Sequence, residues 1–538
     1  MAYTRSQKLK FTVVRLGRFV KALVKNRKGL LGFAILVALV ILALVPQFFT
    51  PYQPVATTDL AGSMSAPSWI RYLPEGGTLS ENTLLVPNPG FDTPSSLNDF
   101  NYVSEEPELI RVWYSSSFGY GKIYGNGPGC AAITYRVSDA PAENATVNME
   151  RAFAYPYGGP PERFTGDIAL FVSGTSRLGT GANITLLVPA KVTIFIRNET
   201  GAVFNLWTTG LISGPTSEWK ITRTSSQISD LDSRSEQLKI FMYGMIYDNA
   251  SRRWIPYIYR YAVYPEMDVF GIKPQNMTFG VEITFLGNPT MNDAETTVFI
   301  DGLYFRTYGT AWGLLGTDKF GRDLFAQLIY GVRLSLYVGF LASIIGVLLG
   351  LTIGLAAGYL GKAVDELLMR LADALLVIPG LPLLIVLIAV LGATINNLII
   401  LLGLLGWMGF ARTVRSQVLS LRERPFIEAA KAAGAGKLHI MVKHVLPNVM
   451  SLVYITLATS VPGAVVAEAS LSWLGFYDPK VMSWGRMLNA VQFEAGGAVE
   501  KWWWAVPPGL CIAILALSFI LIGFSMDEVL NPRLRARA

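Results

Sequence analysis

Long uncharged runs of hydrophobic residues lie near both ends of the chain. The first covers residues 29–49. At about 1.5 Å per residue, this run is long enough to cross a hydrocarbon core of about 30 Å as a helix. Five further runs follow residue 313, within the region 314–538. Together they predict an α-helical membrane protein with six transmembrane helices, the last five at 334–360, 374–392, 395–410, 449–466 and 505–526.

Between the first and second runs, residues 50–313 follow a different pattern. Short β-branched and aromatic runs alternate with turn residues, as in an antiparallel sandwich. We therefore expect an inserted β-rich, sandwich-like domain at about 75–311. The clearest runs are residues 167–172, 191–196, 281–285 and 297–305, and the last faintly resembles the closing strand of carbohydrate-binding jelly rolls.

The first 28 residues contain nine basic side chains and no acidic one. Apolar residues recur there at spacings of three and four, which predicts an amphipathic helix on the inner membrane surface; a solvated basic tail is the alternative. A cleaved signal peptide is disfavoured, because its apolar region would be about 7–15 residues long and end at small residues. The apolar positions are Leu9, Val13, Leu16, Val20 and Leu23.

The composition agrees with a membrane protein, since 51% of residues are hydrophobic and 15% are charged. An ordinary soluble domain has about 25% charged residues. Residues 50–313 hold 25 acidic and 18 basic side chains, net −7, so the remaining 13 acidic and 27 basic side chains give +14. The overall charge of +7 therefore reflects the membrane part and does not indicate nucleic-acid binding.

The basic residues also predict the orientation in the plasma membrane. They gather in the amino-terminal segment, between the fourth and fifth runs, and at residues 533–537. By the positive-inside rule, both termini are expected in the cytoplasm and residues 50–313 on the extracytoplasmic side.

No pattern in the chain predicts a catalytic, nucleotide or metal site, so we expect a subunit that is not an enzyme and holds no cofactor. The string 434–438 lacks the first glycine and the hydroxyl residue of a phosphate-binding loop. His439 and His444 are five residues apart, which is not a metal-ligand spacing on one helix face. Cys130 and Cys511 fall in different parts of the chain, which excludes a disulfide framework.

Small and helix-bending residues mark the predicted helices. Glycine recurs every fourth residue in the second run, which predicts a face for close helix packing, within the bundle or against a partner subunit. Pro379, Pro382 and Pro462 are expected to bend or break their helices. The four glycines are Gly346, Gly350, Gly354 and Gly358.

Glycosylation is a further hypothesis for the segment assigned outside. Five Asn-x-Ser/Thr sequons occur in it, each a potential acceptor of an N-linked glycan. The asparagines are Asn144, Asn183, Asn198, Asn249 and Asn276.

The loop at 411–448, between the fourth and fifth runs, is predicted to carry the function. Residues 426–433 are expected to form a short helix whose alanines permit close approach to a partner. Gly434 allows the turn that ends it, and Pro447, after Leu446, is placed at the start of the next membrane helix. Such a helix, held at both ends, can transmit a push as a rigid lever.

This loop, with Glu428, Ala429, Ala430 and Gly434, resembles the EAA motif of ABC importer permeases. The chain outside 75–313 is similar to the C-type permease subunit of dipeptide and oligopeptide importers. The similar segments are 66–68, 315–323, 330–336, 357–361, 468–475, 483–485 and 530–534. In that family the first two lie close together in sequence, whereas here 246 residues (69–314) separate them, so the external domain is an insertion.

The resemblance implies a permease subunit of an ATP-driven importer of di- and oligopeptides. Its implied partners are a second homologous permease in a heterodimer, two ATP-binding subunits that hold ATP and Mg, an extracytoplasmic substrate-binding protein and the lipid bilayer. The EAA loop, from Glu428 to Leu446 and Pro447, would convert ATPase motion into alternating access.

Three other functions stay open at this stage. The same machinery could import oligosaccharides. The chain could work alone as a secondary carrier or channel, although its predicted spans hold almost no ionisable residue. It could also be a surface receptor, for which five of the spans would be surplus. The insertion itself is either a docking platform for the binding protein or a cap over the outer mouth.

Overall fold

The fold comes from a computed structural model that describes most of the chain in two compact units. Residues Met1–Thr58 with Arg322–Ala538 form one, here called the helical unit, and Asp59–Gly321 form the other, the β unit. The predicted amphipathic segment (apart from residues 25–28), the basic carboxyl terminus and Asn249 lie outside the described residues. Those residues are 25–87, 90–119, 129–138, 140–178, 183–184, 187–216, 220–224, 245–248, 253–256, 270, 273–494 and 501–530.

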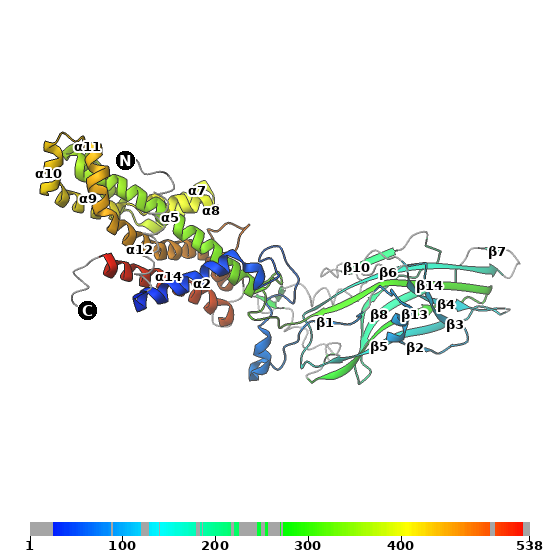
Figure 1. Ribbon diagram of the computed structural model, residues 1–538. Helices are drawn as coiled ribbons and strands as arrows, with labels where there is room; N and C mark the ends of the chain where they lie inside the picture. The colour runs from blue at the N-terminus through cyan, green and yellow to red at the C-terminus, as the bar shows by residue number, and fades with distance from the viewer. Residues whose placement is uncertain are drawn as a thin grey trace, which may run out of the picture. The chain divides into compact units, whose positions relative to one another are not determined.

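The helical unit confirms the predicted membrane fold (Figure 1). In the described residues, five helices are long and apolar enough to cross a membrane, or six if one bent pair counts as a single span. The spans are α2 (Arg27–Leu44), α5 (Leu324–Leu360), α8 with α9 (Ile395–Leu405, Met408–Arg422), α12 (Leu446–Trp473), α14 (Trp502–Leu530) and the bent pair α6 and α7 (Lys362–Val377, Gly380–Leu391). A shorter helix, α13 (Trp484–Phe493), lies between α12 and α14.

Several predicted helix ends were wrong, because hydropathy does not report on caps. The first span ends at Leu44, since Pro46 opens a separate 3-10 turn. The second begins ten residues before its predicted start, where the Asp323 carboxylate accepts the backbone N–H groups of Phe325 and Ala326 at 3.1 and 3.3 Å. The fourth, fifth and sixth spans extend to Arg422, Trp473 and Leu530.

The third predicted span is not one straight helix. The axes of α6 and α7 differ by 89°. Ile378, between them, is extended with φ −75° and ψ 126°. The ring of Pro379 disfavours the helical conformation in the residue before it, which explains the break. Pro382 and Pro462 lie inside α7 and α12.

The β unit contains the predicted two-sheet insertion. One antiparallel sheet has the order β10-β6-β14-β4-β3, with β1 on β14 and β7 on β6; the other has the order β2-β5-β13-β8-β9, and β11 pairs with β12. All four runs singled out above lie in strands. The strands are β1 (Thr83–Leu84), β2 (Asn101–Ser104), β3 (Ile110–Ser115), β4 (Cys130–Arg136), β5 (Ala145–Tyr155), β6 (Arg163–Leu178), β7 (Asn183–Ile184), β8 (Ala190–Arg197), β9 (Val203–Thr208), β10 (Lys220–Thr224), β11 (Met245–Asp248), β12 (Arg253–Pro256), β13 (Gln275–Phe285) and β14 (Met291–Tyr308).

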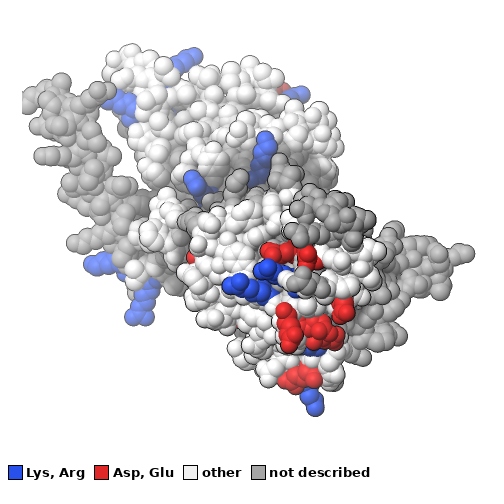
Figure 2. Space-filling view, turned by 90° about the vertical axis from the view of Figure 1, so that its right-hand side faces the viewer, with Lys and Arg blue, Asp and Glu red and all other residues white. Residues whose placement is uncertain are grey.

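Alternate side chains of the two sheets form one shared core, as strand geometry requires. Ile133, Val172 and Val298 come from the first sheet and are fully buried. Val281 and Ile194 face them from the second. Acidic side chains gather on one end of this unit beside a few basic ones (Figure 2), in line with its net negative charge.

The two chain segments that enter and leave the β unit are joined to each other. We call residues 59–68 and 309–321 the neck. The backbone N–H of Ala66 donates to the Thr310 carbonyl at 2.8 Å, and that of Thr317 to the Ser65 carbonyl at 3.0 Å. Gly316 has φ +81°, and a Cβ there would lie 2.0 Å from the Ser65 oxygen. The structural unit is therefore wider than the predicted 75–311.

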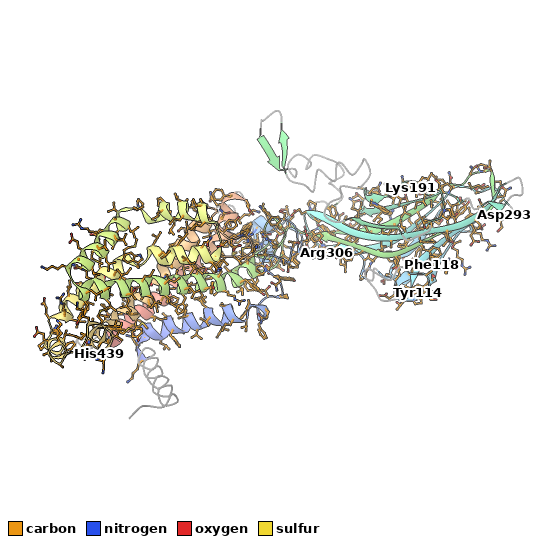
Figure 3. All side chains as sticks on the ribbon, turned by 90° about the horizontal axis from the view of Figure 1, so that it is seen from above. Tyr114, Phe118, Lys191, Asp293, Arg306 and His439 are labelled. Carbon is orange, nitrogen blue, oxygen red and sulfur yellow. The ribbon has the colours of Figure 1, made fainter. Side chains whose placement is uncertain are left out.

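Cys130 lies fully buried on the face of the first sheet that points away from the shared core. Its Sγ donates to the Phe118 carbonyl at 3.0 Å, and the Phe118 ring packs 4.8 Å from that of Phe171 (Figure 3). Burial raises the pKa of the Cys130 thiol to about 12; the charge of Asp301 adds to the rise, and Ser115 opposes it.

We therefore expect Cys130 to resist alkylation near neutral pH. The thiolate is the nucleophile in this reaction. At this pKa, the fraction of Cys130 present as thiolate near neutral pH is roughly a thousandfold lower than for an ordinary thiol. Mass spectrometry after maleimide treatment should find Cys130 unmodified in the native chain and modified after denaturation. A C130A variant measures the background at Cys511. Rapid labelling of native Cys130 would contradict the buried position.

Candidate functional site

The predicted lever forms a short helix at one end of the helical unit (Figure 1). It is α10 (Pro425–Ala432), followed by α11 (Lys437–Ile440). Arg424 is extended, and Pro425 takes the first helical position, where its missing N–H leaves no hydrogen bond unmade. Glu428 lies in the first turn, where a negative charge interacts favourably with the helix dipole.

The end of α10 is a Schellman turn. Gly434 has φ +80°, its N–H donates to the Lys431 carbonyl at 3.0 Å, and the N–H of Ala435 donates to the Ala430 carbonyl at 3.1 Å. Both Ala430 and Ala435 pack against the buried cluster beneath, which is the apolar contact that accompanies this motif. Gly434 thus sets the direction in which the chain leaves the lever.

Ile427, which sequence reasoning missed, anchors the lever. Its side chain is fully buried in a cluster supplied by α5, α9 and the start of α12. It lies three residues before Ala430 on the same helix face, and that spacing was the available signal. The other fully or almost fully buried members of the cluster are Val414, Val418, Ile440, Val445 and Val449.

The opposite face of the loop is open. Glu428 and Ala429 are exposed, whereas Ala430 is half-buried. Three apolar side chains accompany them: Phe426 is 44% exposed, Leu438 72% and Val442 56%. Large exposed apolar side chains around a carboxylate are typical of a surface that meets a partner.

Pro447 takes the second position of α12, near its predicted place at the start of the membrane helix, but helical structure begins before it. Helix runs without interruption from Lys437 to Trp473, and residues Met441–Val445 form a π-helical turn. The N–H of Leu446 accordingly donates to the Met441 carbonyl, five residues back. Such a turn accommodates a proline whose ring would clash with an α-helical carbonyl. Leu446 is half-buried and Pro447 exposed.

The two histidines also lie in this region, with His439 at one end of the helical unit (Figure 3). Their ring centroids are 6.0 Å apart. No group of three or more His, Cys, Asp or Glu side chains that could hold a metal occurs in the described part of the chain. Cys130 and Cys511 are both free thiols.

The glycine stripe of α5 lies against α8 and α9, within the chain. A Cβ on Gly350 would lie 2.9 Å from the Trp407 carbonyl oxygen, and one on Gly354 would lie 2.6 Å from that of Ala411. A Cβ on Gly358 would lie 3.0 Å from the Arg415 carbonyl oxygen, and one on Gly346 would lie 3.4 Å from that of Gly403. The stripe therefore brings α5 against the helix that leads into the lever.

Two ion pairs, also missed from sequence, fasten α6 to the same helix. Arg415 of α9 donates to both carboxylate oxygens of Asp365, with one bond of 2.7 Å. Arg412, one turn earlier, pairs with Asp373. The helix before the lever thus contacts both α5 and the first half of the broken span.

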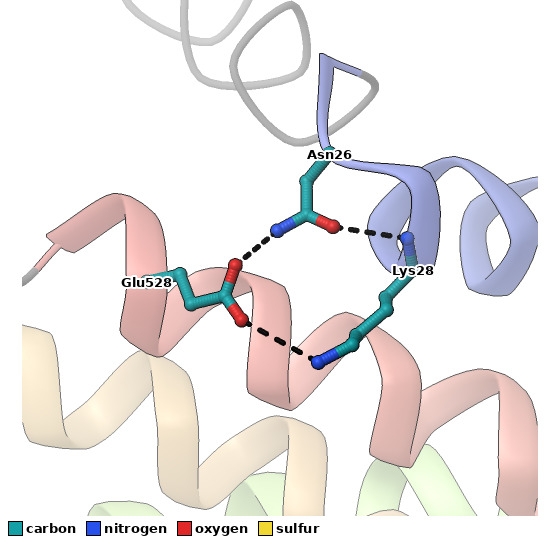
Figure 4. A network of polar contacts seen from close by, with 3 residues as sticks. All are labelled: Asn26, Lys28 and Glu528. Carbon is teal, nitrogen blue, oxygen red and sulfur yellow. Dashed lines mark hydrogen bonds and ion pairs between the residues drawn. The ribbon is translucent and has the colours of Figure 1, made fainter. Parts of the chain in front are cut away.

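A third polar contact joins the first and last helices (Figure 4). The Asn26 side chain caps α2 by accepting the Lys28 N–H at 2.9 Å and donates to Glu528 of α14. The Lys28 ammonium lies 3.7 Å from the same carboxylate. Because both charged side chains are exposed, this pair orients the helices more than it stabilises them.

The sequons do not share one environment. Asn144 and Asn276 are exposed. Asn198 is 8% exposed, and its side-chain oxygen accepts the Ala202 N–H at 2.8 Å. The side chain of Asn183, like Asn249, lies outside the described residues.

Known proteins resemble the helical part of the chain. Residues 350–536 match the family described as the binding-protein-dependent transport system inner membrane component, and residues 15–67 match the N-terminal TM domain of oligopeptide transport permease C. A putative peptide transport system permease protein of Brucella suis is 40% identical over 223 residues, 41% of this chain and 74% of the relative.

Two relatives from Bacillus subtilis give the same picture. The dipeptide transport system permease protein DppC is 36% identical over 222 residues, which cover 41% of this chain and 68% of the relative. The oligopeptide transport system permease protein OppC is 34% identical over 223 residues, covering 41% and 72%.

Proposed function

Because this chain belongs to the binding-protein-dependent transport system inner membrane components, the permease subunits of ABC transporters, we propose that it moves di- and oligopeptides across the membrane. It is a multi-pass inner membrane protein and a non-catalytic component of an ABC transporter complex. Peptide cargo is supported by the printed names of the relatives, which are peptide, dipeptide and oligopeptide permeases.

The observation that carries the coupling role is the geometry of α10. Ile427 and the Schellman turn at Gly434 hold the helix rigidly on the bundle, while Glu428 and Ala429 face outward. A rigid lever with an exposed face transmits a push from an ATPase subunit to α9 and α12, between which it lies. Because Ala430 is half-buried, the docking contacts are assigned to Glu428, Ala429 and the adjoining Phe426.

The partners and orientation follow from the same proposal. A second homologous permease completes the translocation path, two ATP-binding subunits hold ATP and Mg, and a substrate-binding protein delivers the peptide. The termini and the lever lie in the cytoplasm, and residues 50–313 lie outside. There, Asn144 and Asn276 are the sequons on the described surface that are open to a glycan.

Reconstitution tests this function. The chain, its second permease, the two ATPase subunits and the binding protein are placed in proteoliposomes, and uptake of labelled tripeptides is compared with that of labelled oligosaccharides. We expect saturable peptide uptake that requires both ATP and the binding protein.

Uptake of oligosaccharides but not peptides would replace the proposed cargo with sugars. Transport by the purified chain alone, without ATP, would instead identify a secondary carrier and overturn the coupling role.

A further inference from the structure

A buried carboxylate lies at the end of α12 opposite the lever. Glu468 precedes the last residue of the helix by five positions and is 3% exposed. Its Oε1 accepts the Ser472 hydroxyl at 2.7 Å. Its Oε2 is the only buried carboxylate oxygen without a hydrogen-bond partner in the described residues. The predicted span at 449–466 stopped short of this residue, so the sequence did not indicate a carboxylate inside a membrane helix.

Glu468 lines a small cavity with a volume of about 20 Å³. A single water needs roughly 10–15 Å³ of cavity volume, so the cavity holds one or two groups of that size. The lining includes hydroxyl and carboxylate groups, from Glu468, Ser472, Ser483 and Asp478. It also includes apolar side chains, from Leu334, Val338, Ile395, Leu398 and Phe476.

The walls of the cavity are held in place by neighbouring elements. Ser483 caps α13 by accepting the Arg486 N–H at 3.1 Å, and the Trp484 indole donates to the Leu328 carbonyl of α5 at 2.9 Å. The Arg486 guanidinium donates to the carbonyls of Pro479 and Val481, at 2.9 and 2.6 Å. Thr394, which is exposed, forms part of the rim. The cavity is therefore a preformed notch that opens to the surface.

The chemistry of the notch favours a compact cation. A buried carboxylate without an ionic partner is unfavourable unless a positive group or a proton compensates it. No ion pair joins Glu468 to a basic side chain in the described part of the chain. An ammonium group is close to the size of water and offers three donors, which match the carboxylate and hydroxyl groups of the residues that line the notch.

We propose that this notch, built on Glu468 with Ser472 and Ser483, receives the α-ammonium group of the transported peptide. The inference rests on the proposed function, since it requires peptides as cargo and the extracytoplasmic position of this end of α12. The peptide would enter amino terminus first, and a peptide without a free amine would lose the charged contact.

The test compares a tripeptide with its N-acetylated form in the reconstituted transporter. Each peptide is used at a concentration that saturates the separate binding protein by direct titration, so differences between permease variants arise in this chain. The wild type should move the free-amine peptide at least about tenfold faster, as expected for a charge-assisted hydrogen bond in a buried site. The E468Q variant should lower that rate to the rate of the acetylated peptide and leave the latter unchanged.

A second variant separates recognition from folding. S472A removes the hydroxyl that donates to Oε1 but keeps the carboxylate, so it should weaken the preference for a free amine less than E468Q does. A variant that merely misfolds would instead lose the uptake of both peptides. An equal preference in wild type and E468Q would overturn the inference while peptide uptake still upheld the proposed function. A complete absence of peptide uptake in the wild type would instead refute the proposed function.

Discussion

Replacing Gly434 with proline should abolish coupled peptide uptake while leaving the membrane helices assembled. Proline fixes φ near about −65°, whereas Gly434 has φ +80°, and its N–H donates to the Lys431 carbonyl. Loss of this bond and of the left-handed turn costs about 2–4 kcal/mol. A change of about 3 kcal/mol alters the population of the native loop by roughly a hundredfold. Peptide-stimulated ATPase activity and uptake in proteoliposomes measure the effect.

The chain offers a matched control two residues further on. Gly436 has φ −66°, and a Cβ there would meet nothing within 4 Å, so G436A should retain uptake. Glu428→Arg provides a complementary change, because it alters the exposed face without touching the turn. Unchanged ATPase stimulation and uptake in both G434P and Glu428→Arg would contradict the coupling role of this helix.

The second large effect concerns the stripe of glycines on α5. In G354A the new methyl group would lie 2.6 Å from the Ala411 carbonyl oxygen and 2.7 Å from the Val414 Cβ. Both contacts belong to α9 and one is backbone, so the two helices must separate. Such overpacking costs about 1–3 kcal/mol. We expect lower thermal stability of the chain in detergent, followed by intrinsic fluorescence or size exclusion on heating.

Gly463 provides a control for which we expect no loss of thermal stability, in contrast to G354A. It lies inside α12, where an added Cβ would meet nothing within 4 Å. Alanine is a better helix former than glycine by up to about 1 kcal/mol, so G463A should match or exceed the wild type in stability. Equal stability of G354A and G463A would show that α5 and α9 are not in close contact at Gly354.

Hydropathy predicted the membrane helices because each span must bury its own backbone hydrogen bonds in hydrocarbon. That requirement acts on a continuous run of residues, so its pattern can be recognised in the sequence without knowledge of the fold. Helix ends depend on single polar groups such as Asp323, and the start of α5 was therefore misplaced by ten residues. The broken third span had a local signal in Pro379, but not the 89° angle between its halves.

The lever also combines features that local sequence predicted with features that depend on tertiary contacts. Pro425, Glu428 and Gly434 indicated a short helix and its end, because capping chemistry is local. The only signal for Ile427 was its three-residue spacing to Ala430, since its importance depends on partners in α5, α9 and α12 that are distant in sequence. The half-buried position of Ala430, which lies beneath the docking face, also follows from those contacts.

The sequence by itself therefore determined the five to six spans, the two-sheet insertion, the short helix of the lever and the charge asymmetry of net −7 against +14. Each follows from the order of apolar, charged and turn-forming residues along a short stretch. The tertiary structure decided the packing of α5 on α9, the closed neck of the insertion and the notch at Glu468. In each case residues far apart in the chain lie within contact distance, and only the packing of whole helices and strands brings them together.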